Sequence, residues 1–68
     1  MNKFCERLKE LRLEKKLTQK ELAKIIQTNN SSICDWECGR AEPNIEMIIK
    51  LCNYFDISSD YLLGIIDF

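Results

Sequence analysis

Three small polar side chains stand in a row at Asn30, Ser31 and Ser32. Amide and hydroxyl groups both donate and accept hydrogen bonds, which is the chemistry needed to read base-pair edges in a DNA groove. The other interpretation of the serines is ordinary chemistry at a helix start, where hydroxyls bond free backbone amides. The row indicates recognition by hydrogen bonding, provided that its side chains face outward.

The other candidates for chemistry are the four thiols at Cys5, Cys34, Cys38 and Cys52. Cys34 and Cys38 are four residues apart and share a helix face. The chain has no His and no Cys-x-x-Cys, so we expect no metal site. Most lone cysteines are small buried hydrophobes, and a redox switch at Cys38 stays an alternative. No two acid–base groups occupy an evident pocket, so we expect no enzyme, cofactor or small-molecule substrate.

Length and composition limit the class of protein. The 68 residues are expected to form one domain, residues 1–68, with little room for a deep catalytic cleft. Apolar residues at 46% and charged residues at 31% are typical of a soluble globular protein. No apolar run approaches about 18 residues, and the N-terminus lacks the apolar stretch of a signal peptide. We therefore expect a cytoplasmic protein without a membrane span.

The net charge of −1 hides an asymmetry along the chain. Residues 1–17 contain six basic and three acidic residues, a net charge of +3. Residues 18–40 are balanced, and residues 41–68 contain one Lys against five acidic residues, a net charge of −4. This distribution is compatible with one face meeting a polyanion, and equally with two solvated faces of opposite sign.

The polar row must be positioned by helices, because apolar spacing predicts an all-α protein with five short helices around one core. The expected ranges are about 2–15, 18–26, 30–38, 45–55 and a fifth helix between Ser58 and Gly64. Thr18 and Glu21 form a capping box, while Asn29 and Asn44 are suited to cap the third and fourth helices. Gly39 is suited to end the third helix.

The same spacing predicts which side chains face the core. The expected inward residues are Phe4, Leu8, Leu11, Leu22, Ala23, Ile25, Ile26, Ile33, Trp36, Ile45, Ile48, Ile49, Cys52 and Phe55, with Leu51 beside this face of the fourth helix and Cys34 as a further candidate. The second and third helices are joined by a three-residue turn and are too short for a bundle hairpin. They suit a helix-turn-helix, whose second helix enters the major groove of DNA.

The sequence resembles the Cro and lambda-repressor-like helix-turn-helix DNA-binding domains. The resemblance covers nearly the whole chain, and its most specific parts are Leu17-Thr18-Gln19-Lys20-Glu21-Leu22-Ala23 and Ile33-Cys34-Asp35-Trp36-Glu37-Cys38-Gly39. It implies sequence-specific binding of double-stranded DNA by a small transcriptional regulator of the repressor type. The alternative is a protein-interaction module of the same fold, antitoxin-like or coactivator-like.

The resemblance also implies roles for individual residues. It assigns base reading to Asn30, Ser31 and Asp35. Asn30 could bond adenine with both of its amide groups, and Asp35 could accept from the amino group of cytosine although it repels phosphates. It assigns phosphate-backbone contacts to Gln19, Lys20, Ser32, Cys38 and Arg40. Gln19 lies at a helix N-terminus, which favours anions, and Arg40 is suited to clamp a phosphate.

Two further positions follow from the resemblance. Arg12 and Glu37 match an ion pair between the first and third helices, which we interpret as structural. The turn position that is often Gly in the family is Gln27 here. A non-Gly residue in a left-handed conformation costs roughly 1 kcal/mol. Either the turn differs from the family, or Gln27 tolerates the strain.

The C-terminal end of the chain is apolar. Family members usually dimerise, so we expect a homodimer surface formed by Tyr61, Leu62, Ile65, Ile66 and Phe68. The alternative is that this end packs back on the first helix against Leu13.

Overall fold

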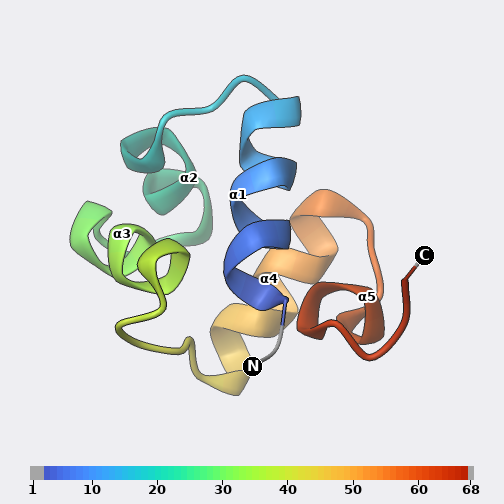
Figure 1. Cartoon of the computed structure of the whole chain (residues 1–68). Helices are drawn as coiled ribbons and strands as arrows, with labels where there is room; N and C mark the ends of the chain where they lie inside the picture. Colours follow the sequence, from blue (N-terminus) through green and yellow to red (C-terminus); the bar gives the residue numbers. More distant parts are fainter. Residues whose placement is uncertain (1–2, 68) are drawn as a thin grey trace.

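The computed structural model describes residues 3–67, and its helices confirm the predicted all-α class. The described residues form five helices and no strand: α1 (Phe4–Glu14), α2 (Gln19–Ile26), α3 (Asn30–Cys38), α4 (Ile45–Phe55) and α5 (Ser59–Leu63) (Figure 1). Their bounds lie close to the predicted ranges, and residue 2, where the first predicted helix begins, lies outside the described part. None of these helices combines the length and apolar character that crossing a bilayer requires.

Local capping explains where the helices begin. The Thr18 hydroxyl accepts from the Glu21 amide at 3.0 Å, and the Thr18 amide donates to the Glu21 carboxylate at 2.8 Å, which confirms the capping box. Asn29 accepts from the Ser32 amide at 2.8 Å, and Asn44 caps α4 in the same way. Caps of this kind stabilise a helix by about 1 kcal/mol each.

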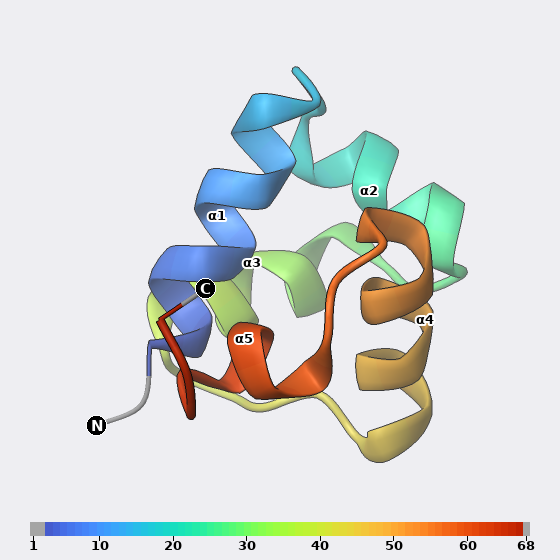
Figure 2. The same ribbon diagram turned by 90° about the vertical axis from the view of Figure 1, so that its right-hand side faces the viewer.

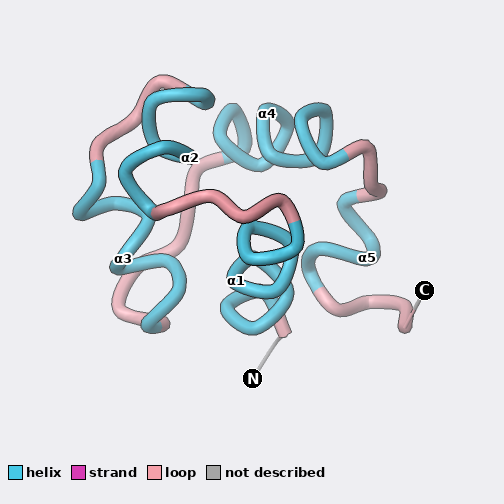
Figure 3. Tube along the Cα trace, turned by 90° about the horizontal axis from the view of Figure 1, so that it is seen from above, coloured by secondary structure: helices cyan, strands magenta, loops and turns pink. Residues whose placement is uncertain are grey.

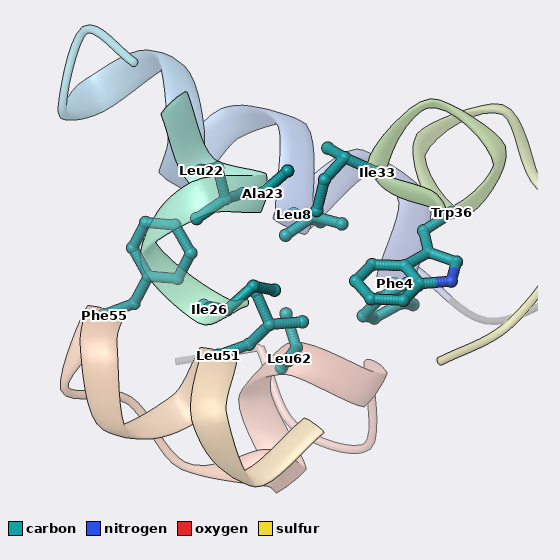
Figure 4. Packing of buried hydrophobic residues seen from close by; sticks show 10 residues of the cluster. All are labelled: Phe4, Leu8, Leu22, Ala23, Ile26, Ile33, Trp36, Leu51, Phe55 and Leu62. Atoms are coloured by element: carbon teal, nitrogen blue, oxygen red, sulfur yellow. The ribbon is translucent and has the colours of Figure 1, made fainter. Parts of the chain in front are cut away.

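Side chains from all five helices meet in one core (Figure 4). The core consists of Phe4, Leu8, Leu22, Ala23, Ile26, Ile33, Trp36, Leu51, Phe55 and Leu62. Burying one large apolar side chain stabilises the fold by about 1.5–3 kcal/mol. The helices depend on this burial, because isolated helices of this length are only marginally stable in water. The core therefore fixes α3 relative to α2 and α1.

The predicted inward face of α4 is wrong in part. Ile45 and Ile49 are 77% and 54% exposed, whereas Leu51 is fully buried. Ile25 of α2 was also expected inside and is exposed. The helix from Ile45 to Phe55 is apolar on more than one side, so spacing alone permits several inward stripes. Packing against α2 and α5 selects the stripe that contains Leu51 and Phe55.

The C-terminal segment packs back on the beginning of α1 (Figure 2). The Arg7 guanidinium donates to the carbonyl oxygens of Tyr61 and Ile66, and its Cζ lies 4.3 Å from the centre of the Tyr61 ring. Leu62 is fully buried in the core, so its predicted place in a dimer surface is wrong. The cause is that α5 is needed to close the core. The alternative, packing back on the first helix, is confirmed, but the contact is made by Arg7, and Leu13 stays 53% exposed.

Two other predicted dimer residues are half-buried, and a third is exposed to solvent. Tyr61 and Ile66 are partly covered by the contacts with Arg7, whereas Ile65 is 70% exposed. Phe68 lies outside the described residues. Figure 3 shows α2 and α3 together at one side of the molecule, with α5 at the opposite side.

Candidate nucleic-acid interface

The turn between α2 and α3 keeps its shape without glycine. Gln27 adopts a left-handed conformation, with φ 64° and ψ 50°. Of the two alternatives offered by the sequence, a different turn or a strained Gln27, the second is therefore present. Lys50 of α4 donates to the Gln27 side chain at 3.2 Å and to the Ile26 carbonyl at 3.3 Å. These bonds neutralise the end of the α2 dipole and hold the turn. Sequence analysis missed Lys50, and its only signal was one cation within an apolar helix.

α3 presents a polar side away from the core. Ile33 is fully buried and Trp36 is 5% exposed, while Asn30 and Ser31 at the beginning of the helix are exposed. The Ser31 hydroxyl donates to the Asn29 carboxamide at 2.8 Å, and Ser32 is half-buried behind them. The outward orientation on which the recognition hypothesis depends is therefore present, and the Asn30 amide is available for an external partner.

Asp35 and Arg40 face each other at the other end of α3. The Arg40 Nε lies 3.2 Å from the Asp35 carboxylate, and the Arg40 backbone amide donates to the Asp35 carbonyl at 2.9 Å. The neighbouring Cys38 and Asp35 raise the pKa of Arg40. A predicted phosphate clamp and a predicted base reader thus form one exposed ion pair.

Cys34 and Cys38 bring their sulfurs to 3.9 Å on the same end of α3. The Arg40 Nη2 lies 3.7 Å from the Cys34 sulfur and 3.8 Å from the Cys38 sulfur. The hydrogen bond with Cys34 raises the pKa of Cys38, so the pair resists losing both protons. Cys38 is exposed and Cys34 is half-buried.

The predicted ion pair between α1 and α3 is present and buried. The Arg12 Nε lies 2.7 Å from the Glu37 Oε2, and Arg12 also donates to the Leu17 carbonyl at 2.7 Å. The Arg12 and Glu37 side chains are 10% and 3% exposed. Gln19 joins them by donating to the Glu37 Oε1 at 3.2 Å, a contact that sequence analysis did not foresee. Gln19, a predicted phosphate contact at the beginning of α2, is therefore linked to α3.

The remaining predicted cation, Lys20, is exposed on the first turn of α2.

A cavity of about 340 Å³ lies elsewhere, between the beginning of α1 and the segment after α3, where Cys5, Gly39 and Pro43 line it. None of the predicted site residues lines this cavity. The arrangement on α2 and α3 is an exposed surface for a large partner.

The comparisons with known proteins agree with this geometry. A family model described as a helix-turn-helix domain matches residues 5–64. The P22 c2 repressor, solved in complex with synthetic operator 9T, has a TM-score of 0.84 and 35% identity, covering 88% of this chain and 91% of that chain.

Two curated relatives are longer than this chain. The uncharacterized HTH-type transcriptional regulator YobD of Bacillus subtilis is 36% identical over 94% of this chain, which spans 57% of that regulator. Multiprotein-bridging factor 1 of Candida albicans is 48% identical over 65% of this chain, which spans 29% of that protein. On the family match and the shared fold, this chain belongs to the helix-turn-helix domain family of the Cro and lambda-repressor-like type.

Proposed function

We propose that the chain, as a single domain, binds double-stranded DNA sequence-specifically and acts as part of a transcriptional regulator of the repressor type. The observation that carries this proposal is the orientation of α3, whose Ile33 and Trp36 are buried while Asn30 and Ser31 face outward. The operator-bound P22 c2 repressor supports it, because its fold covers most of this chain. The family also supports a cytoplasmic location and a role without catalysis.

In this proposal α3 enters the major groove. Asn30, Ser31 and Asp35 read bases, while Gln19, Lys20, Ser32, Cys38 and Arg40 contact the phosphate backbone. The Asp35–Arg40 ion pair has a consequence here: Arg40 must divide its charge between a phosphate and Asp35, which is 43% exposed. We therefore expect modest affinity for each domain and a shallow salt dependence, since few phosphates are neutralised.

The test is selection of bound fragments from random duplex DNA, followed by titration at increasing salt. A binder should enrich one site, and its affinity for that site should fall as salt rises, because binding releases counterions from the phosphates. If no sequence is enriched and no salt dependence is measured, sequence-specific DNA binding is excluded for this chain.

We also propose a homodimer on DNA, with half-sites about 34 Å apart. The predicted dimer residue Ile65 supports this proposal, because it lies just after α5 and is 70% exposed. Ile65→Asp should abolish dimers seen by light scattering in the presence of a two-half-site duplex, with Leu13→Asp as the matched exposed control. Unchanged dimers in Ile65→Asp would exclude this surface.

The second candidate is a protein-interaction module. It is favoured by the relative named Multiprotein-bridging factor 1 and by the absence of Lys and Arg from α3, where Arg40 just after the helix is paired with Asp35. In that case Asn30→Ala should leave any weak DNA binding unchanged, whereas a DNA reader should lose affinity for its selected site.

A further inference from the structure

Two thiols on α3 lie close enough to act together. The Cys34 and Cys38 sulfurs are 3.9 Å apart, Cys38 is exposed, and neither cysteine is in a disulfide. Base reading in a groove does not require a thiol pair at this position, so the pair has a separate chemical explanation.

The geometry favours an atom placed between the sulfurs over a bond that joins them. Residues four apart on a helix have Cβ atoms about 5–6 Å apart. A disulfide needs Cβ atoms about 3.5–4.5 Å apart, so closing one would distort α3. Two sulfurs bonded to one central atom at about 2.3 Å must lie less than about 4.6 Å apart, whatever the angle at that atom. The observed 3.9 Å separation is within this limit, so one atom can bridge the sulfurs after small rotations of the two side chains.

The surrounding charge selects the kind of central atom. The Arg40 guanidinium lies within 3.8 Å of both sulfurs, so it repels a metal cation. Zinc would also need four ligands, and residues 3–67 contain no cluster of three or more His, Cys, Asp or Glu side chains that could hold a metal. A trivalent arsenical is uncharged and needs only two thiols, so neither objection applies to it.

We propose that Cys34 and Cys38 form a two-thiol site on α3 that binds trivalent arsenicals. In the hydrated arsenical each thiol proton passes to a hydroxyl on arsenic, that hydroxyl leaves as water, and an arsenic–sulfur bond replaces the arsenic–oxygen bond. Arsenic stays trivalent and nothing is oxidised. The site lies beside Asp35 and Arg40, so a bound arsenical should compete with a duplex, a consequence that rests on the proposed function.

The test uses phenylarsine oxide under anaerobic conditions, with intact-mass measurement and thiol titration. The wild-type chain and the matched control Cys5→Ser/Cys52→Ser should each gain one phenylarsenic group, lose two titratable thiols, and recover both with excess 1,2-ethanedithiol. Cys34→Ser and Cys38→Ser, checked for helix content by circular dichroism, should lose this binding. Undiminished binding in either folded variant, or a mass decrease of two hydrogens without arsenic, would overturn the site.

A second measurement separates this site from the proposed function. Fluorescence anisotropy with the selected duplex should show loss of DNA binding when the wild-type chain is treated, and no change when Cys34→Ser is treated. If the untreated chain binds DNA but gains no arsenical, the site is wrong and the function stands. If the arsenical binds but no duplex does, the site stands and the function is wrong. Simultaneous binding of both would overturn the competition.

Discussion

Asn30 begins α3 and Arg40 lies two residues after its end at Cys38, and under the proposed function the two should differ in what they contribute to DNA binding. Asn30 is exposed, and in the proposed function its amide forms two hydrogen bonds to one base, which would make it a source of selectivity. Arg40 is bonded to Asp35 and can add only a phosphate contact, which every sequence offers. The two side chains therefore test specificity and general affinity separately.

Asn30→Ala should weaken binding to the selected site by about 1–3 kcal/mol and leave binding to unrelated DNA unchanged. Arg40→Ala should weaken both alike and reduce the salt dependence, because one phosphate contact is lost. Titrations of both variants on a selected and a scrambled duplex measure this. An equal loss for Asn30→Ala on both duplexes would contradict its role as a base reader.

Glu37 bonds α3 to Arg12 of α1 and to Gln19 of α2. It receives hydrogen bonds from Arg12 and Gln19 while 3% exposed, so removal of its charge leaves the Arg12 cation buried and poorly compensated. Glu37→Gln should lower the free energy of unfolding by about 3–5 kcal/mol, measured by urea denaturation. The double variant Arg12→Met/Glu37→Leu should recover most of the loss, because well-packed apolar residues can replace a buried pair.

The control for Glu37 is an exposed pair of the same chain. Lys3 and Asp67 are 3.4 Å apart with the Asp67 side chain 82% exposed, and such pairs contribute about 0–1 kcal/mol. Lys3→Met should therefore change the unfolding free energy little. A loss equal to that of Glu37→Gln would show that burial is not what makes the inner pair important.

At the level of helices, the capping box at the beginning of α2 introduces a pH dependence. Bonds from the Thr18 amide and hydroxyl lower the pKa of Glu21 from its ordinary value of 4.5. A carboxyl whose pKa is lowered by folding stabilises the fold above its unfolded pKa, and this contribution is lost as pH falls through the folded pKa. α2 should therefore be held most firmly at neutral pH.

Glu21→Gln isolates this contribution, because glutamine can keep the capping box but does not titrate. The wild-type chain should be the more stable of the two near pH 7, and the difference in unfolding free energy should shrink as pH falls below 4.5. Urea denaturation at several pH values measures it. A difference that stays constant with pH would show that the charge of Glu21 contributes nothing to the cap.

For the molecule as a whole, Arg7 ties the two ends of the described chain together. It is 7% exposed and reaches the Tyr61 and Ile66 carbonyls, the Tyr61 ring and the Asp67 carboxylate. This places the C-terminal segment by α1 and α5, away from the side where α2 and α3 lie (Figure 3). The arrangement suits the proposed function, because the Asp67 carboxylate lies beside Arg7 and away from a duplex bound at α3.

Arg7→Lys keeps the charge but removes the fork that bonds two carbonyls at once. We expect faster hydrogen exchange at the Ile65 and Ile66 amides, which bond to Asp60, while the α3 amides keep their rates. Lys3→Met is the matched control on the same side of the chain. Equal acceleration throughout the molecule would mean that Arg7 supports global stability and not the C-terminal segment in particular.

How much of the structure could be predicted from the sequence depended on how far apart in the chain the interacting residues lie. The five helices, the Thr18–Glu21 box and the burial of Trp36 could be predicted, because caps and apolar periodicity act over only a few neighbouring residues. The inward side of α4 and the burial of Leu62 could not, because an apolar helix offers several faces and only its neighbours select one. The contacts of Lys50 with Gln27 and of Arg7 with Ile66 join residues distant in the chain, and they exist only once the core has brought those residues together.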